Sequence, residues 1–142
     1  MRLLFSWIAM TEDLVKSKAT GEISGPTLQI LKSEKIDALY LFSNDKKSQE
    51  KASKLKSYVK ENSHEFKINK KIQIHLEYLA LKSPADYQNL WEMLPKKVKT
   101  IVRQYKEQET EIYFNLSSGT RAMTSTWLMM VGTGEINAKL IS

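Results

Sequence analysis

Apolar and polar positions follow two patterns along this chain, one typical of buried strands and one typical of amphipathic helices. Nearly continuous apolar runs at residues 3–8 and 36–42 indicate strands that are covered on both faces of a sheet. Residues 72–79 alternate apolar and polar side chains more strictly, which favours a strand near the sheet edge. Shorter apolar runs at 111–116 and 138–141 predict a fourth and a fifth strand.

Helices are expected after each of the first four strands. Their predicted ranges are 26–35, 46–62, 84–105 and 120–131. Ser83 is the predicted N-cap of the third helix, with Pro84 in its first turn, and Pro95 should kink or interrupt that helix. A polar loop of about 17 residues, longer than most such connections, follows the first strand. The alternation predicts an α/β fold: a Rossmann-like open sheet, mostly parallel, with helices on both faces.

Composition narrows the class of protein. A length of 142 residues fits one domain over 1–142, and the chain has no cysteine, which excludes disulfides, thiolate metal sites and cysteine nucleophiles. No apolar run is long enough to span a membrane or to form a signal peptide, so a cytoplasmic location is expected. Because the sequence stops within its last strand, we expect either a domain excised from a longer protein or a domain whose remaining residues are absent here.

The net charge of +6 is concentrated in one stretch. Residues 46–71 contain nine lysines and three glutamates. A solvated helix face explains this pattern, whereas a nucleic-acid patch would carry arginines and exposed aromatic side chains among the lysines. We therefore expect no direct DNA binding by this domain.

The segment NLSSGTRAM, residues 115–123, lies between the fourth predicted strand and the last helix. In a Rossmann-like sheet, ligands bind beyond the carboxyl ends of the strands, where the strand order reverses. That point lies between the first and fourth strands. The residues expected to meet there are Ser6, Trp7 and Ile8 from the first strand, and Asn115, Ser117, Ser118, Gly119, Thr120 and Arg121 from this segment.

The residue types of this segment suit an anion. Gly119 lets the backbone turn and approach a ligand, and Ser118 or Thr120 can cap the helix, whose first amides point outward. Ser117 adds a hydroxyl donor, and Arg121 adds a planar fork that matches phosphate. Ordinary helix capping explains the same local sequence, and only the predicted position at the switch point favours a ligand.

Other chemistries have weaker support. The segment lacks the flanking glycines of a nucleophile elbow, and the two histidines, His64 and His75, lie in a polar stretch and a strand. Neither glycine-rich nucleotide fingerprint is present, and no cluster of acids suggests a metal. No cofactor and no metal are expected.

These features resemble the CARF (CRISPR-associated Rossmann fold) family over essentially the whole chain. The resemblance rests on the opening strand RLLFSWI and on the late motif, in which Asn115, Gly119, Thr120, Arg121 and Met123 match the family pattern. It implies a sensor that binds a cyclic oligoadenylate, tetra- or hexa-adenylate, at the cleft of a homodimer. Such a sensor regulates an attached effector in type III CRISPR immunity.

By position, the resemblance places Ser6, Trp7 and Ile8 on one side of the ligand and residues 115–121 on the other. Ser43 and Asn44 would contribute from the second strand, and Trp7 would either stack on an adenine or pack under the loop. Two alternatives stay open: a ring nuclease that cleaves the ligand without metal, and another Rossmann-like nucleotide-handling enzyme. The sequence identifies no catalytic residue.

Overall fold

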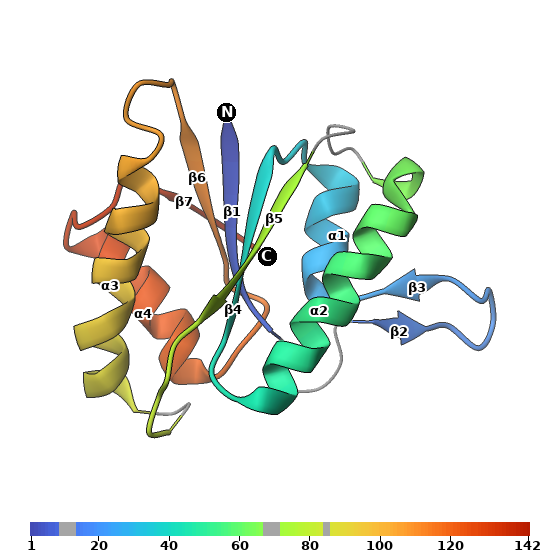
Figure 1. Ribbon diagram of the computed structural model, residues 1–142, viewed down its shortest axis with the longest axis horizontal. Helices are drawn as coiled ribbons and strands as arrows, with labels where there is room; N and C mark the ends of the chain where they lie inside the picture. Colours follow the sequence, from blue (N-terminus) through green and yellow to red (C-terminus); the bar gives the residue numbers. More distant parts are fainter. Residues whose placement is uncertain (9–13, 67–71, 84–85) are drawn as a thin grey trace.

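Five parallel strands form the central sheet of the computed structural model, in the order β5-β4-β1-β6-β7 (Figure 1). The structure describes residues 1–8, 14–66, 72–83 and 86–142. The strands are β1 (Arg2–Trp7), β4 (Ala38–Ser43), β5 (Gln73–Tyr78), β6 (Glu111–Asn115) and β7 (Lys139–Ile141). This arrangement confirms the predicted α/β, Rossmann-like class and the edge position of the third predicted strand.

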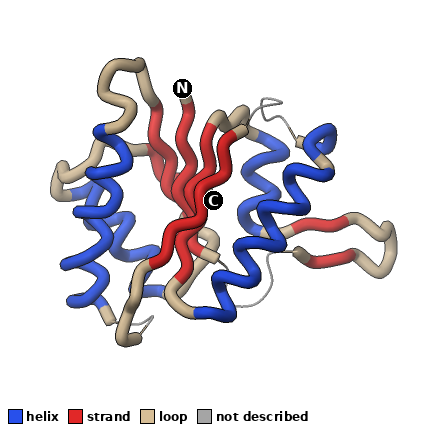
Figure 2. Tube along the Cα trace, in the orientation of Figure 1, coloured by secondary structure: helices blue, strands red, loops and turns tan. Residues whose placement is uncertain are grey.

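The centre of the sheet is buried because helices cover both of its faces. Helices α1 (Pro26–Ser33) and α2 (Lys46–Glu61) lie on one face, and α3 (Tyr87–Arg103) and α4 (Arg121–Gly132) lie on the other (Figures 1 and 2). Every residue of β4 is buried, as its unbroken apolar run predicts. A short 3₁₀ helix, Ser63–Glu65, follows α2.

An aromatic cluster fills the space between the sheet and helices α3 and α4. The ring of Phe5 in β1 stacks on Tyr40 at 5.1 Å between centroids, and the ring of Phe114 in β6 stacks on Trp127 of α4 at 4.3 Å. All four side chains are at most 2% exposed. Stacked and edge-to-face rings add to the gain from burying their area, so this cluster fixes α4 against the sheet.

Two details of the third predicted helix differ from expectation: its N-cap, and the interruption that was one of the two effects expected of Pro95. Asp86, not Ser83, is the N-cap of α3, because its carboxylate accepts a hydrogen bond from the Asn89 amide at 3.1 Å. Pro84 lies outside the described residues. The helix also continues through Pro95 to Arg103 without interruption.

The segment predicted as a loop after the first strand contains a β-hairpin. Strands β2 (Val15–Lys16) and β3 (Ile23–Ser24) pair antiparallel and project from the body of the molecule (Figure 1). Each has only two residues, too few for a period-two pattern to be visible in the sequence. Residues 9–13 of the predicted loop lie outside the described residues.

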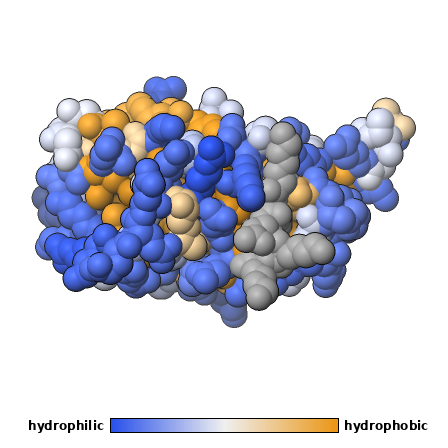
Figure 3. Space-filling view, turned by 90° about the horizontal axis from the view of Figure 1, so that it is seen from above, coloured by the Kyte–Doolittle hydropathy of each residue, from blue (hydrophilic) through white to orange (hydrophobic). Residues whose placement is uncertain are grey.

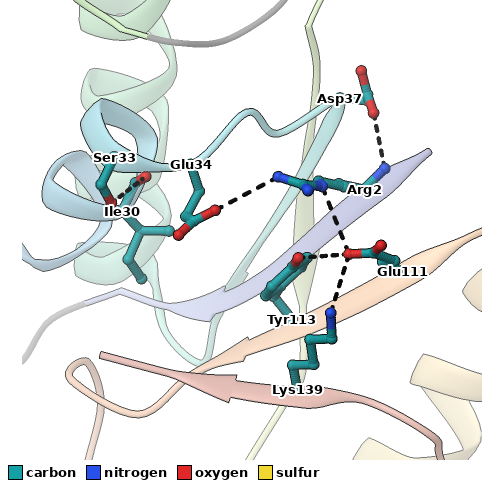
Figure 4. A network of polar contacts seen from close by, with 8 residues as sticks. All are labelled: Arg2, Ile30, Ser33, Glu34, Asp37, Glu111, Tyr113 and Lys139. Atoms are coloured by element: carbon teal, nitrogen blue, oxygen red, sulfur yellow. Dashed lines mark hydrogen bonds and ion pairs between the residues drawn. The ribbon is translucent and has the colours of Figure 1, made fainter.

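The strands begin at a charged edge of the sheet. The Glu111 carboxylate accepts a hydrogen bond from the Tyr113 hydroxyl at 2.6 Å and pairs with Arg2 at 3.6 Å and Lys139 at 3.5 Å (Figure 4). These contacts, led by the Tyr113 hydrogen bond, lower the pKa of Glu111 below its ordinary value. Figure 3 views the molecule from this side, and hydrophilic residues cover most of it.

Candidate functional site

The candidate site lies at the opposite edge, where the parallel strands end. Strand β1 is hydrogen-bonded to β4 on one side and to β6 on the other. The chain leaves β1 toward α1 on one face of the sheet and leaves β6 toward α4 on the other (Figure 1). The strand order therefore reverses between β1 and β6, which is where such folds hold ligands.

Asn115, the last residue of β6, is fully buried and connects the segments that meet at this point. Its amide nitrogen donates to the Ser6 hydroxyl at 3.0 Å and lies 3.4 Å from the Ser118 hydroxyl. Its amide oxygen accepts from the Ser117 backbone at 2.9 Å and from the Ser117 hydroxyl at 2.6 Å. One side chain thus holds the end of β1 and the turn before α4 together.

The hydrogen-bond chain continues to the first turn of α1. The Ser6 and Thr27 hydroxyls lie 2.9 Å apart, and both residues are fully buried. Because buried polar groups cost free energy unless they are paired, this neutral network fixes the relative positions of β1, β6 and α1. Thr27 was not among the residues predicted for this site. Its position directly after the helix-initiating Pro26 was the only sequence signal for its role.

Two structural features favour glycine at position 119. Its φ of +101° lies in a region that residues with a Cβ rarely adopt. A Cβ at this position would also lie 3.0 Å from Cβ of Trp7 and 3.1 Å from the sulfur of Met123. The turn before α4 therefore rests directly on the end of β1.

Trp7 lies beneath that turn and is 1% exposed. Its ring packs against Phe42 at 5.5 Å and Trp127 at 6.5 Å between centroids. Of the two roles expected for Trp7, packing under the loop is the one found in this structure. Its neighbour Ile8 is also buried, and the Ile8 amide donates to the Phe42 carbonyl at 3.0 Å.

Thr120 is the N-cap of α4, one of the two residues predicted for that role. Its hydroxyl accepts from the Met123 amide at 3.2 Å, and its own amide donates to the Met123 sulfur at 3.3 Å. Helix geometry leaves the Arg121 amide, at the first position of α4, without an intrahelical acceptor. The positive end of the helix dipole therefore points out of this turn.

Two of the predicted donors face solvent. Ser117 and Arg121 are exposed, whereas Ser6, Asn115 and Ser118 are buried. The exposed pair can contact a ligand directly, and the buried residues hold the turn that presents the pair. The sequence gathered all five in one group and could not separate these two tasks.

Ser43 and Asn44 lie at the end of β4, the strand next to β1. Ser43 is 3% exposed, and its hydroxyl lies 3.4 Å from the Glu77 carbonyl. Asn44 is half-buried beside Asp45, the N-cap of α2. Hydrogen bonds from Ser48, first from its backbone amide, lower the pKa of Asp45. Both predicted residues are thus at the expected edge, one strand away from Ser6.

The described residues contain neither a cluster of metal ligands nor a membrane-spanning helix. Within 1–8, 14–66, 72–83 and 86–142, no three histidine, aspartate or glutamate side chains gather as a metal would need. In the same ranges, no helix has the length and apolar character needed to cross a membrane.

Comparison with known proteins gives a likeness in structure. No family model matches the chain, and the comparison with curated proteins gives no match. The structure is similar to Csm6 of Enterococcus italicus bound to cyclic hexa-2′-fluoro-hexa-dAMP, with a TM-score of 0.75 and 21% sequence identity. The match covers 99% of this chain and 33% of the Csm6 chain, so this chain spans about a third of that protein's length. The likeness confirms the fold that the resemblance to CARF domains implies.

Proposed function

We propose that this chain is a CARF-type sensor module that binds a cyclic oligoadenylate at the carboxyl edge of its sheet. The observation that carries the proposal is the turn at residues 117–121, whose exposed Ser117 and Arg121 are held at the switch point by the buried Asn115 network. The similar Csm6 structure contains a cyclic hexanucleotide, which supports a ligand of that class.

The chemistry of the turn suits the phosphodiesters of such a ring. The Arg121 guanidinium can form paired hydrogen bonds with phosphate oxygens, and the N-terminus of α4 favours negative charge. The Ser117 hydroxyl lies beside them and donates its proton to Asn115 at 2.6 Å, so it becomes a donor to phosphate when it turns from Asn115 to the ligand. A net charge of +6 adds a long-range attraction for any polyanion.

The proposal includes a homodimer. An even-numbered ring can share its two-fold axis with an isologous pair of subunits, each presenting the same turn to half of the phosphates. Exposed apolar side chains on α4 support an interface beside the turn, because Leu128 is 47% exposed and Met129 is 44% exposed. Within a longer protein, ligand binding would then regulate an attached effector in type III CRISPR immunity.

Ligand binding is tested with labelled cyclic tetra- and hexa-adenylate and the purified chain. We expect one of the rings to bind at micromolar concentration or tighter. Arg121→Ala should weaken binding and lower the slope of log affinity against log salt by about 0.7–0.9, the value for one lost phosphate contact. Arg103→Ala is the matched control, because Arg103 is an exposed arginine in the last turn of α3. This variant should leave both the affinity and the salt slope unchanged.

The same experiment decides between sensing and cleavage. Intact ligand recovered from the complex supports a sensor. Linear product would support the alternative, in which Ser117 and Arg121 position the ribose 2′-hydroxyl for attack on the neighbouring phosphate. Failure of both rings to bind would overturn the proposed function.

A further inference from the structure

Strand β5 and helix α2 form a second candidate binding surface, away from the Asn115 network. β5 is an edge strand of the sheet, paired with β4 on one side only. The Gln73 amide donates to the carbonyl of Asp37, the residue before β4, at 3.2 Å, and the Leu79 amide donates to the Ser43 carbonyl at 2.9 Å. Because backbone groups alternate along a strand, the N–H and C=O groups of Ile74, Leu76 and Tyr78 point away from β4.

The side chains along this edge leave β5 open to pairing with a further strand. Leu76 is 40% exposed and Tyr78 is 49% exposed. Native proteins commonly protect an edge with outward charges, proline or a bulge. The acid within β5, Glu77, does not serve this purpose, because its carboxylate is paired with Lys97 of α3 at 2.9 Å.

A groove runs beside this edge, between β5 and α2. It has a volume of about 620 Å³, with Ile72 and Ile74 among its apolar lining and Lys56 and Lys60 at its wall. A separate pocket of about 230 Å³ is lined in part by Leu76 and Tyr78. None of the ion pairs within the described ranges involves Lys56 or Lys60.

Charge decides between the possible occupants of the edge. Helix α2 contains six lysines and two glutamates over its 16 residues. A second copy pairing through β5 would bring two such helices side by side, and their like charges would oppose the contact. A nucleic acid would satisfy the lysines but has no peptide backbone to pair with the outward amides and carbonyls of β5.

We infer that the β5 edge binds an extended acidic peptide segment as a sixth strand of the sheet. The backbone of the segment pairs with Ile74, Leu76 and Tyr78, and its carboxylates on the α2 side lie beside Lys56 and Lys60. Because successive side chains of a strand point to opposite faces, the apolar side chains of the segment lie on the other face of the sheet, toward α3. The site is a means of attaching a separate partner protein through an acidic segment.

The probe is a fluorescein-labelled peptide in which valine and glutamate alternate over six residues, the length of β5. Anisotropy titration with the purified chain should show saturable, salt-sensitive binding. A probe with lysine in place of glutamate should not bind. A probe that is N-methylated at alternate backbone positions should not bind either, because it cannot pair as a strand.

Two double variants with equal change in net charge test the place of binding. Lys56→Glu with Lys60→Glu should weaken binding about tenfold, since two charge contacts become repulsive. Lys47→Glu with Lys54→Glu alters exposed lysines of α2 that do not line the groove, and should weaken binding by less than about twofold through the general field alone. Equal losses in the two variants would overturn the proposal.

Leu76→Pro tests the backbone contact from the protein side. Its N–H points away from β4, so proline removes a donor to the added strand while sparing the native ladder. We expect loss of probe binding with an unchanged circular dichroism spectrum. If this variant does not fold, the N-methylated probe makes the same test, and its binding as tightly as the parent peptide would overturn the proposal.

Two further results would also overturn the inference. One is tighter binding of poly-uridylate than of the peptide, lost in both double variants, which would assign the surface to RNA. The other is concentration-dependent dimerisation that Leu76→Pro abolishes, which would assign the edge to a second copy. Binding of cyclic oligoadenylate is a separate measurement, and its outcome does not affect this one.

Discussion

The polar side chains at the two ends of the parallel sheet are arranged in opposite ways. Where the strands end, Ser6, Thr27 and Asn115 are fully buried, neutral and joined by hydrogen bonds. Where they begin, Arg2 and Glu111 are exposed, charged and paired at 3.6 Å. A buried neutral network is costly to disturb, whereas exposed ion pairs contribute little because water and salt screen them. The difference indicates that precise positioning is confined to the carboxyl edge.

Removal of the Asn115 side-chain amide should cause the largest loss of stability. Asn115→Ala removes the side chain that joins Ser6 to Ser117, so that the Ser6 hydroxyl keeps Thr27 as its partner but the Ser117 amide loses its side-chain acceptor. We expect a cost of about 2–3 kcal/mol in the free energy of unfolding. Urea denaturation measures this loss. We also expect weaker cyclic oligoadenylate binding, because the turn at 117–121 loses its support. A loss below about 0.5 kcal/mol would mean that the network does not hold the carboxyl edge.

Gly119→Ala should have the next largest effect. The new methyl group meets Cβ of Trp7 at 3.0 Å in a backbone conformation that alanine disfavours, so we expect a loss of about 2 kcal/mol. Gly134→Ala is the matched control: Gly134 has a φ of +78° and nothing within 4 Å of an added Cβ. Backbone strain alone should cost the control about 1 kcal/mol. Equal losses would show that the contact with Trp7 is unimportant.

Disruption of the charged edge should have a smaller effect. Glu111→Gln removes the two ion pairs with Arg2 and Lys139 but keeps an acceptor for the Tyr113 hydroxyl. We expect a small loss of stability at low salt that disappears in molar salt, because exposed pairs are screened there. Asn115→Ala should lose as much at high salt as at low salt. A salt-independent loss in Glu111→Gln would contradict the contrast between the edges.

The smallest expected effect is the pH dependence of the stability that Glu111 contributes. The folded pKa of Glu111 is lowered, so its contribution is complete above the ordinary glutamate pKa and is lost as pH falls through the lowered folded value. The difference in unfolding free energy between the natural chain and Glu111→Gln should therefore vanish in acid. The difference for Asn115→Ala, a neutral side chain, should persist over the same range. A constant difference for Glu111→Gln would exclude this linkage.

The sequence predicted the central strands well because they are buried on both faces. The apolar run at 36–42 corresponds to β4, and its predicted ends differ from the observed ends by two residues or fewer. A continuous apolar run is stable as a strand only where both faces are covered, which is the centre of the sheet. Helix starts were harder to predict, because Ser83 and Asp86 are both good caps. Only the hydrogen bond from the Asn89 amide decides for Asp86.

The sequence grouped the residues of the candidate site but did not separate their roles. Residue types placed Ser6, Ser117 and Ser118 together, but a serine in a strand and a serine in a turn look alike in a sequence. Burial separates them: Ser117 is exposed, and the other two are at most 2% exposed. The close approach of Gly119 to Trp7 is a tertiary contact across more than a hundred residues, which no local pattern encodes.

The indoles beneath the turn also provide an optical signal. Trp7 and Trp127 supply two of the chain's three tryptophans, and among the described residues neither buried indole N–H has a hydrogen-bond partner. Indoles in such dry surroundings emit at short wavelength. Because Trp7 contacts Gly119, a shift of the turn alters the environment of that emitter directly. The natural chain thus carries an intrinsic fluorescent reporter for movement of this turn, which can test the proposed ligand binding without any added dye.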